Sequence, residues 1–180
     1  MPYSSPPADC LIVLTVGREA VSDFAGSLYD PSVELRSERP EQDGSKLLTC
    51  YGAYTGSQGT AGDGVSANTV FITLRVDQPG ASGDGDVVEQ TRRSFTSYRD
   101  EHTSAVKILP DLGDDAYSYR EVADRDVAVN VDFRKGNATM HIRLNRSHAG
   151  APLPHQETSV ESDALTLARA LADNLDSLLS

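Results

Sequence analysis

Five polar residues between positions 127 and 144 carry the groups best suited to chemistry. They are Asn130, Asp132, Arg134, His141 and Arg143. Within each run they lie two residues apart, and alternate residues of a β-strand point to the same side. An amide, a carboxylate, an imidazole and two guanidinium groups on one face can hydrogen-bond a polar ligand. With Phe71 and Arg75 from a neighbouring strand, they form the predicted candidate face; the alternative is a solvated or helix-covered surface.

No pattern typical of a catalytic or metal site accompanies these residues. The histidines are His102, His141, His148 and His155. None lies four residues from another, and there is no Cys-x-x-Cys pair, Gly-x-Ser-x-Gly elbow or phosphate loop. We therefore predict a protein that is not an enzyme, with no catalytic residue, no metal and no cofactor. The alternative is a hydrolase, which requires a serine, a histidine and an acid in one pocket.

The chain has two cysteines, Cys10 and Cys50. Two widely spaced cysteines in an acidic chain rich in Gly, Ser and Thr can pair in an oxidising compartment. The alternative is two buried thiols in a cytosolic protein. Counting free thiols in denaturant without reductant distinguishes the two.

An antiparallel hairpin over residues 127–144 must position the candidate face. Apolar residues occupy every second position from 127 to 133 and again from 138 to 144. Gly136 and Asn137 lie between these runs and accept the positive φ of a tight turn. The hairpin is expected at the centre of a sheet, with one face on a core and the other wet.

The remaining pattern predicts helices alternating with groups of strands. Helices are expected over residues 15–28, 87–101 and 158–178, and strands over 33–36, 46–54, 68–77, 105–109 and 116–122. Thr15, Asp86 and Thr158 are the expected N-caps. This order predicts an α+β fold, with an antiparallel β-sheet of about five to seven strands packed against helices; a PsbP-like arrangement is an analogy. Residues 10–180 are expected to form a single domain, after a disordered linker over residues 1–9.

Composition excludes some partners. The 180 residues carry a net charge of −11, from 27 acidic and 16 basic residues. Nucleic acid is therefore an unsuitable partner, because its binding depends on neutralising phosphates. No apolar run approaches the roughly 20 residues of a membrane span. Attachment to a membrane is expected only through a tether absent from this chain.

The order of several motifs resembles a family of uncharacterised actinobacterial lipoproteins. The motifs are Cys10 followed by Leu and Thr, Cys50-Tyr51 in a strand, Leu112-Gly113-Asp114-Asp115-Ala116-Tyr117, the Arg134–Asn137 turn and the Ala164–Ala168 helix. The resemblance covers most of residues 10–178. The family usually has Trp near the second cysteine, whereas this chain has Tyr51 or Tyr54 there.

The resemblance implies an extracytoplasmic domain with a Cys10–Cys50 disulfide, secreted or anchored on the outer side of the cytoplasmic membrane. The family's activity is unknown, so no catalytic residue follows from it. We expect a binding module that recognises a small ligand, a peptide or a cell-envelope partner, with the candidate face edged by two mobile loops, 56–67 and 78–85. The alternative from another class is the extracellular sensor domain of a transmembrane signalling protein, such as a receptor Ser/Thr kinase.

Overall fold

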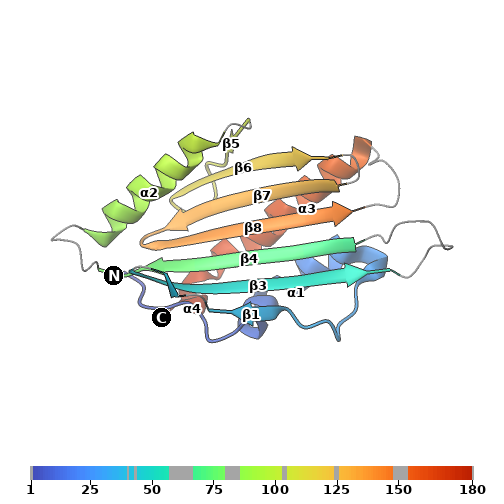
Figure 1. Cartoon of the computed structure of the whole chain (residues 1–180), viewed down its shortest axis with the longest axis horizontal. Coiled ribbons are helices and arrows are strands. Elements are labelled where there is room, and N and C mark those ends of the chain that lie inside the picture. Colours follow the sequence, from blue (N-terminus) through green and yellow to red (C-terminus); the bar gives the residue numbers. More distant parts are fainter. Residues whose placement is uncertain are drawn as a thin grey trace.

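A computed structural model describes residues 2–39, 41–42, 44–56, 67–79, 86–102, 105–123, 126–147 and 154–179. Most of the two loops expected to edge the candidate face, residues 57–66 and 80–85, lie outside the described residues. Figure 1 shows one broad sheet with helices packed on it.

The sheet is antiparallel and open. Its strand order is β1 (Arg36–Glu38), β3 (Ser45–Thr55), β4 (Ala67–Asp77), β8 (Ala138–Ser147), β7 (Asp126–Lys135), β6 (Asp115–Val122) and β5 (Lys107–Ile108). The short β2 (Glu41–Gln42) also pairs with β3. The predicted hairpin is β7–β8, which lies in the middle of this order (Figure 1). The predicted α+β class is confirmed, and the PsbP-like analogy stays a prediction.

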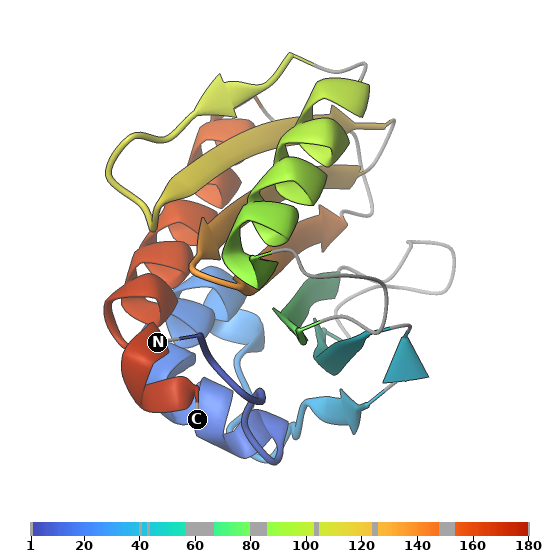
Figure 2. The ribbon, with the colours of Figure 1, turned by 90° about the vertical axis from the view of Figure 1, so that its left-hand side faces the viewer.

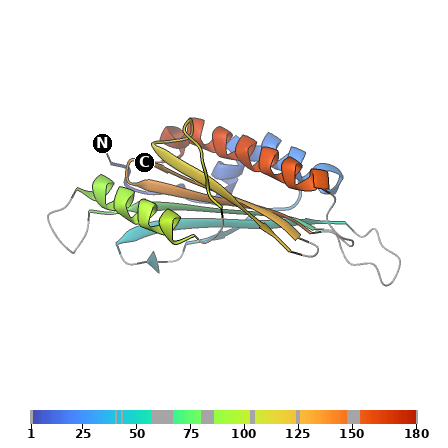
Figure 3. The ribbon, with the colours of Figure 1, turned by 90° about the horizontal axis from the view of Figure 1, so that it is seen from above.

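Two helices cover one face of the sheet. These are α1 (Cys10–Ala25), which continues into the 3₁₀ turn η1 (Gly26–Leu28), and α3 (Pro154–Asp173), which is followed by α4 (Leu175–Leu178). Figure 3 shows α1 and α3 side by side on this face. They approach closely at Gly17, where a Cβ atom would lie 2.7 Å from the Leu167 Cδ1 atom. The apolar residues of the hairpin and of α3 share one core with them.

The opposite face is partly covered by α2 (Val87–Glu101). Figure 2 shows α2 and α3 on opposite sides of the sheet. The Asp86 side chain caps α2 by accepting a hydrogen bond from the Val88 N–H group, as predicted. The Phe95 ring of α2 packs on Tyr117 of β6, with centroids 5.2 Å apart. The expectation of a wet face is therefore wrong in part, since Asn130, Asp132 and Arg134 on that face are buried.

Several element boundaries differ from the predictions. Helix α1 begins at Cys10 with Asp9 as its N-cap, and Thr15 lies within the helix, where its hydroxyl donates to the Leu11 carbonyl. Helix α3 begins at Pro154, so Thr158 is not its cap. The strand expected at 33–36 is β1, at 36–38, since β1 pairs with β3 only over those residues. Tyr3 hydrogen-bonds Asn137 in the structure, and the disordered linker over residues 1–9 stays a prediction.

Candidate ligand-binding cleft

The register of β4, β8 and β7 brings residues of the candidate face into adjacent pairs. His141 lies opposite Asp132 on one side and Thr73 on the other. Arg143 lies opposite Asn130 and Phe71 in the same way. These residues point to one side of the sheet because they occupy alternate positions on their strands. The candidate face required the strand that carries Phe71 and Arg75 to lie beside the hairpin, and in the structure this strand, β4, pairs with β8.

A hydrogen-bonded pair, His141 and Asp132, lies on this face. The Nδ1 atom of His141 lies 2.9 Å from the Oδ1 atom of Asp132, whose side chain is 9% exposed. The Phe71 ring packs edge-on against the imidazole, with centroids 6.0 Å apart. A carboxylate on Nδ1 fixes the ring's orientation and leaves Nε2 for another partner. The Oδ2 atom of Asp132 is buried and has no hydrogen-bond partner among the described residues.

A cleft of about 390 Å³ lies between α2 and this part of the sheet. Thr73, Thr139 and His141 line it from the sheet, and Ser94 and Tyr98 line it from α2. Its remaining lining residues are Leu47, Arg75, Asp77, Thr91, Phe95, Tyr117, Asp132 and Met140. Hydroxyl groups, an imidazole and aromatic rings therefore surround one open space, which is the usual composition of a small-molecule site.

Aromatic residues of α2 and β6 form the far wall of this region. Tyr117 is fully buried, and its ring packs on Phe95 and lies 6.3 Å from the Tyr119 ring. His102 stacks on Tyr119 at a centroid distance of 4.2 Å. Burial raises the pKa of the Tyr117 and Tyr119 hydroxyls above the ordinary value. The Tyr117 hydroxyl has no hydrogen-bond partner among the described residues.

Sequence reasoning missed this wall. Tyr117 and Tyr119 lie at alternate positions of β6, opposite Asp132 and Asn130 of β7. Their spacing of two was the available signal, since it places both rings on one face of the strand. This spacing alone does not indicate a site, because the sequence does not show that α2 lies over that face.

Only part of the candidate face reaches the cleft. Arg75, Asp132 and His141 line it, and Phe71 touches His141. Arg134 is instead held by Asp114 and Asp115, at 3.2 Å and 2.6 Å. Asn130 and Arg143 bond to each other, because the Arg143 Nη1 group donates to the Asn130 Oδ1 atom at 3.4 Å. Arg143 also pairs with Glu121.

A second cleft, of about 490 Å³, lies between α1 and the segment that leads to β1. Leu11, Leu14, Val33 and Leu35 line it, together with the charged residues Asp9, Arg18 and Glu34. None of its lining residues carries a buried polar atom that lacks a partner among the described residues. The cleft under α2 is therefore the better candidate for specific recognition.

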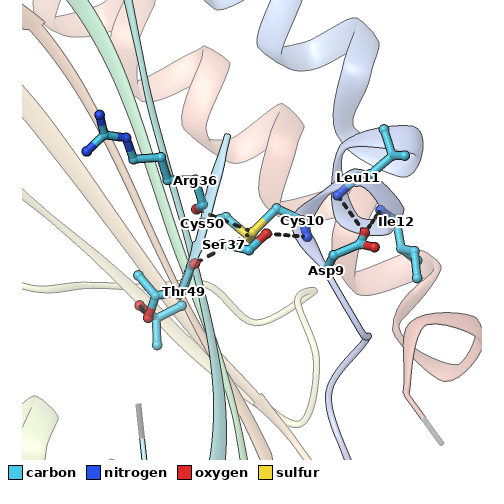
Figure 4. Close-up of a disulfide and its surroundings, with 9 residues drawn as sticks. Asp9, Cys10, Leu11, Ile12, Arg36, Ser37, Thr49 and Cys50 are labelled. Carbon is cyan, nitrogen blue, oxygen red and sulfur yellow. Dashed lines mark hydrogen bonds between the residues drawn. A yellow bond between two sulfur atoms is a disulfide. The ribbon is translucent and has the colours of Figure 1, made fainter. Parts of the chain in front are cut away.

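A disulfide joins Cys10 to Cys50 and so ties the start of α1 to β3 (Figure 4). The two Cα atoms are 5.6 Å apart. The Cys10 N–H group donates to the Ser37 hydroxyl at 3.0 Å, which brings β1 to the same point. The predicted pairing is present, and disulfides are typical of compartments outside the cytoplasm.

Comparison with known proteins gives little further information. No protein-family profile matches the chain, and no curated protein matches it. A solved structure, the crystal structure of LpqN involved in cell envelope biogenesis of Mycobacterium tuberculosis, aligns with 78% of this chain and 83% of its own. The identity is 15% and the TM-score is 0.28, too low to support an argument about fold or function. The resemblance to actinobacterial lipoproteins therefore stays a prediction.

Two general properties of the described residues bear on the site. None of the helices there combines the length and apolar character needed to cross a membrane. No group of three or more His, Cys, Asp or Glu side chains within the same residues is arranged to hold a metal ion.

Proposed function

We propose that the protein is an extracytoplasmic binding module that takes a small polar ligand into the cleft between α2 and the sheet. The disulfide supports the compartment, because cytosolic reductants keep such thiols reduced. The observation that carries the proposal is the Asp132–His141 pair in this cleft, beside a buried Asp132 oxygen and a buried Tyr117 hydroxyl that find no hydrogen-bond partner within the described part of the chain. Buried polar groups without partners cost stability, and proteins concentrate such costs at functional sites.

A cleft-blocking substitution tests the proposal. Ser94 is exposed on α2 and lines the cleft, so Ser94→Trp fills the space without disturbing the core. Arg93 lies on the same helix, outside the cleft, with a side chain that is 75% exposed. Arg93→Trp is therefore the matched control for the added indole.

The assay is a thermal-shift screen of small molecules, followed by titration of each hit into the three proteins. Hits are expected to stabilise the wild type and Arg93→Trp and to lose their effect in Ser94→Trp. A hit that binds Ser94→Trp equally well places recognition elsewhere. An empty screen, together with no capture from envelope extract, refutes the module as described.

The full reading frame distinguishes the two forms that such a module takes. A lipidation signal before the domain identifies a lipoprotein. A membrane span joined to a kinase domain identifies the extracellular sensor of a receptor Ser/Thr kinase.

A second candidate function, hydrolysis, is favoured by one observation. Ser94, His141 and Asp132 line the same cleft, and the Asp132–His141 bond has the geometry that orients a general base. No hydrogen bond joins His141 to a serine among the described residues, which is why binding is preferred. Labelling by a fluorophosphonate probe, lost in both Ser94→Ala and His141→Ala, would establish the hydrolase in place of the binding module. An unlabelled protein that does not cleave p-nitrophenyl butyrate excludes a serine esterase.

A further inference from the structure

At one end of the sheet, the hairpin turn contacts residues 2–5. The Tyr3 N–H group donates to the Oδ1 atom of Asn137 at 2.7 Å. The Asn137 Nδ2 group donates back to the Tyr3 carbonyl at 2.9 Å. A residue in a neighbouring strand would offer the same two bonds. The side-chain amide of Asn137 therefore hydrogen-bonds both the N–H and the carbonyl group of one peptide residue.

The Tyr3 side chain is recognised separately. Its ring lies against the bare backbone of Gly136, where a Cβ atom would be 3.5 Å from the ring's Cε2 atom. Its hydroxyl donates to Asp176, and the Lys135 ammonium holds the other oxygen of that carboxylate at 2.8 Å. Burial, then the hydrogen bond to Asp176, raises the pKa of the Tyr3 hydroxyl above its ordinary value.

The next residue is also held. The Ser4 carbonyl accepts hydrogen bonds from the Lys46 Nζ atom at 3.0 Å and from the Gln78 Nε2 atom at 3.1 Å. Asn137 is fully buried, and its amide makes a further bond to the Asp77 carbonyl at 2.7 Å, which fixes its orientation. The groups that bind the peptide segment therefore come from the hairpin turn, β3, β4 and α4.

We propose that this cradle is a peptide-recognition site for an extended segment that carries a tyrosine, and that residues 2–5 occupy it in cis. The residues that define the specificity are Asn137 for the backbone, Gly136 for the ring and Asp176 for the hydroxyl. The cradle lies outside the cleft under α2, so the two proposals stand or fall independently. A covalently linked segment has an effective concentration in the millimolar range, so a free peptide competes poorly unless the linked segment is weakened.

The test uses the full chain with Tyr3→Ala and a capped peptide with the sequence of residues 1–6. Amide NMR signals of Gly136 and of the Asn137 side chain are expected to shift on titration, with saturation in the millimolar range. The wild type should bind the same peptide at least tenfold more weakly, because its own segment occupies the cradle. A peptide with phenylalanine in place of the tyrosine should bind Tyr3→Ala about tenfold more weakly, since it lacks the bond to a carboxylate.

Second variants keep the result interpretable. Asp176 is exposed, and its hydrogen bonds are to the ring hydroxyl and Lys135, so Asp176→Asn in the Tyr3→Ala chain should weaken peptide binding without unfolding the domain. Ser94→Trp, which fills the other cleft, should leave peptide binding unchanged. The proposal is overturned if the peptide causes no shifts in Tyr3→Ala or equal shifts in the wild type. Loss of peptide binding in Ser94→Trp would overturn it too, because the peptide would then occupy the cleft.

Discussion

Replacing Tyr117 with phenylalanine should make the protein more stable. The Tyr117 side chain is fully buried, and its hydroxyl is closed to solvent with no hydrogen-bond partner among the described residues. An unmet buried polar group costs about 1–3 kcal/mol. Removing the oxygen leaves a small void that offsets part of this gain. We expect a net stabilisation of about 1 kcal/mol, and therefore a rise in Tm of about 2–4 °C for a chain of this size.

Urea and thermal unfolding at pH 7, followed by circular dichroism, measure this change. Tyr119→Phe is the matched control, because Tyr119 is also on β6, is 8% exposed, and has a hydroxyl that is not among the buried, unpartnered atoms. Its free energy of unfolding should change by less than about 0.5 kcal/mol. A destabilisation of Tyr117→Phe by more than about 1 kcal/mol would show that the hydroxyl has a partner. That result would remove one of the two unmet groups from the argument for the cleft.

Three further predictions follow from the same contacts. Replacing Cys10 and Cys50 with serine should lower the free energy of unfolding by about 4 kcal/mol and Tm by about 10 °C, because the disulfide closes a loop of 40 residues in the unfolded chain. Unfolding the wild type with and without reductant gives the same comparison. Gly113→Ala should lower the free energy of unfolding in urea by about 2 kcal/mol or more, since φ is +63° and the new Cβ would lie 2.5 Å from the Arg134 carbonyl oxygen. The control is Gly26→Ala, where φ is +56° and no atom lies within 4 Å of the new Cβ, so the loss should be only about 1 kcal/mol. The free energy of unfolding should fall above about pH 10, by up to about 1.4 kcal/mol per pH unit for each of Tyr117 and Tyr119. Burial raises the pKa of both hydroxyls in the folded protein, so the unfolded chain loses these protons first. A stability that stays constant through alkaline pH would contradict this.

The hairpin was predictable because its signal is entirely local. Alternation of apolar and polar residues fixes which side chains face the core, and Gly136 with Asn137 fixes the turn between the strands. Gly136 has φ +59°, as the turn requires. The same alternation in β3 and β4 predicted two further strands. Their order beside the hairpin is a tertiary property, which the pattern of one strand does not contain.

The start of α1 was missed for a physical reason. Asp9 caps the helix by accepting hydrogen bonds from the Leu11 and Ile12 N–H groups, but Leu11 and Ile12 are exposed. Two exposed apolar residues break the expected amphipathic pattern, and Thr15 offered a later cap. The disulfide explains the earlier start, since Cys10 opens the helix and is bonded to β3.

The candidate face was only partly predictable because α2, from a distant part of the chain, helps to form the cleft there. Sequence spacing placed Asp132 and His141 on the same face of the hairpin, and in the structure they are also hydrogen-bonded. It did not indicate that Arg134 would be neutralised by Asp114 and Asp115. A charged residue on a strand face is available to a ligand only when no loop carboxylate reaches it first.

The charges of the cleft predict what kind of ligand it takes. Arg75 is paired with Asp77 at 2.6 Å, and the His141 imidazole is hydrogen-bonded to Asp132 at 2.9 Å, so these polar groups of the lining already have partners. The side chains of the lining that remain for a ligand are mainly hydroxyls and aromatic rings, including Tyr98, which is 54% exposed.

A neutral ligand fits this lining better than an anion, which the net charge of −11 also repels. Neutral hydroxylated compounds, sugars among them, should therefore supply the hits of the screen, because their hydroxyls can bond to Thr73 and Ser94 while their apolar faces stack on Tyr98. Affinity should change little between 50 mM and 500 mM salt, since no net charge is neutralised on binding. An anionic ligand whose affinity falls steeply over that range would show that Arg75 or His141 leaves its carboxylate partner on binding, and the assignment of a neutral ligand would be wrong.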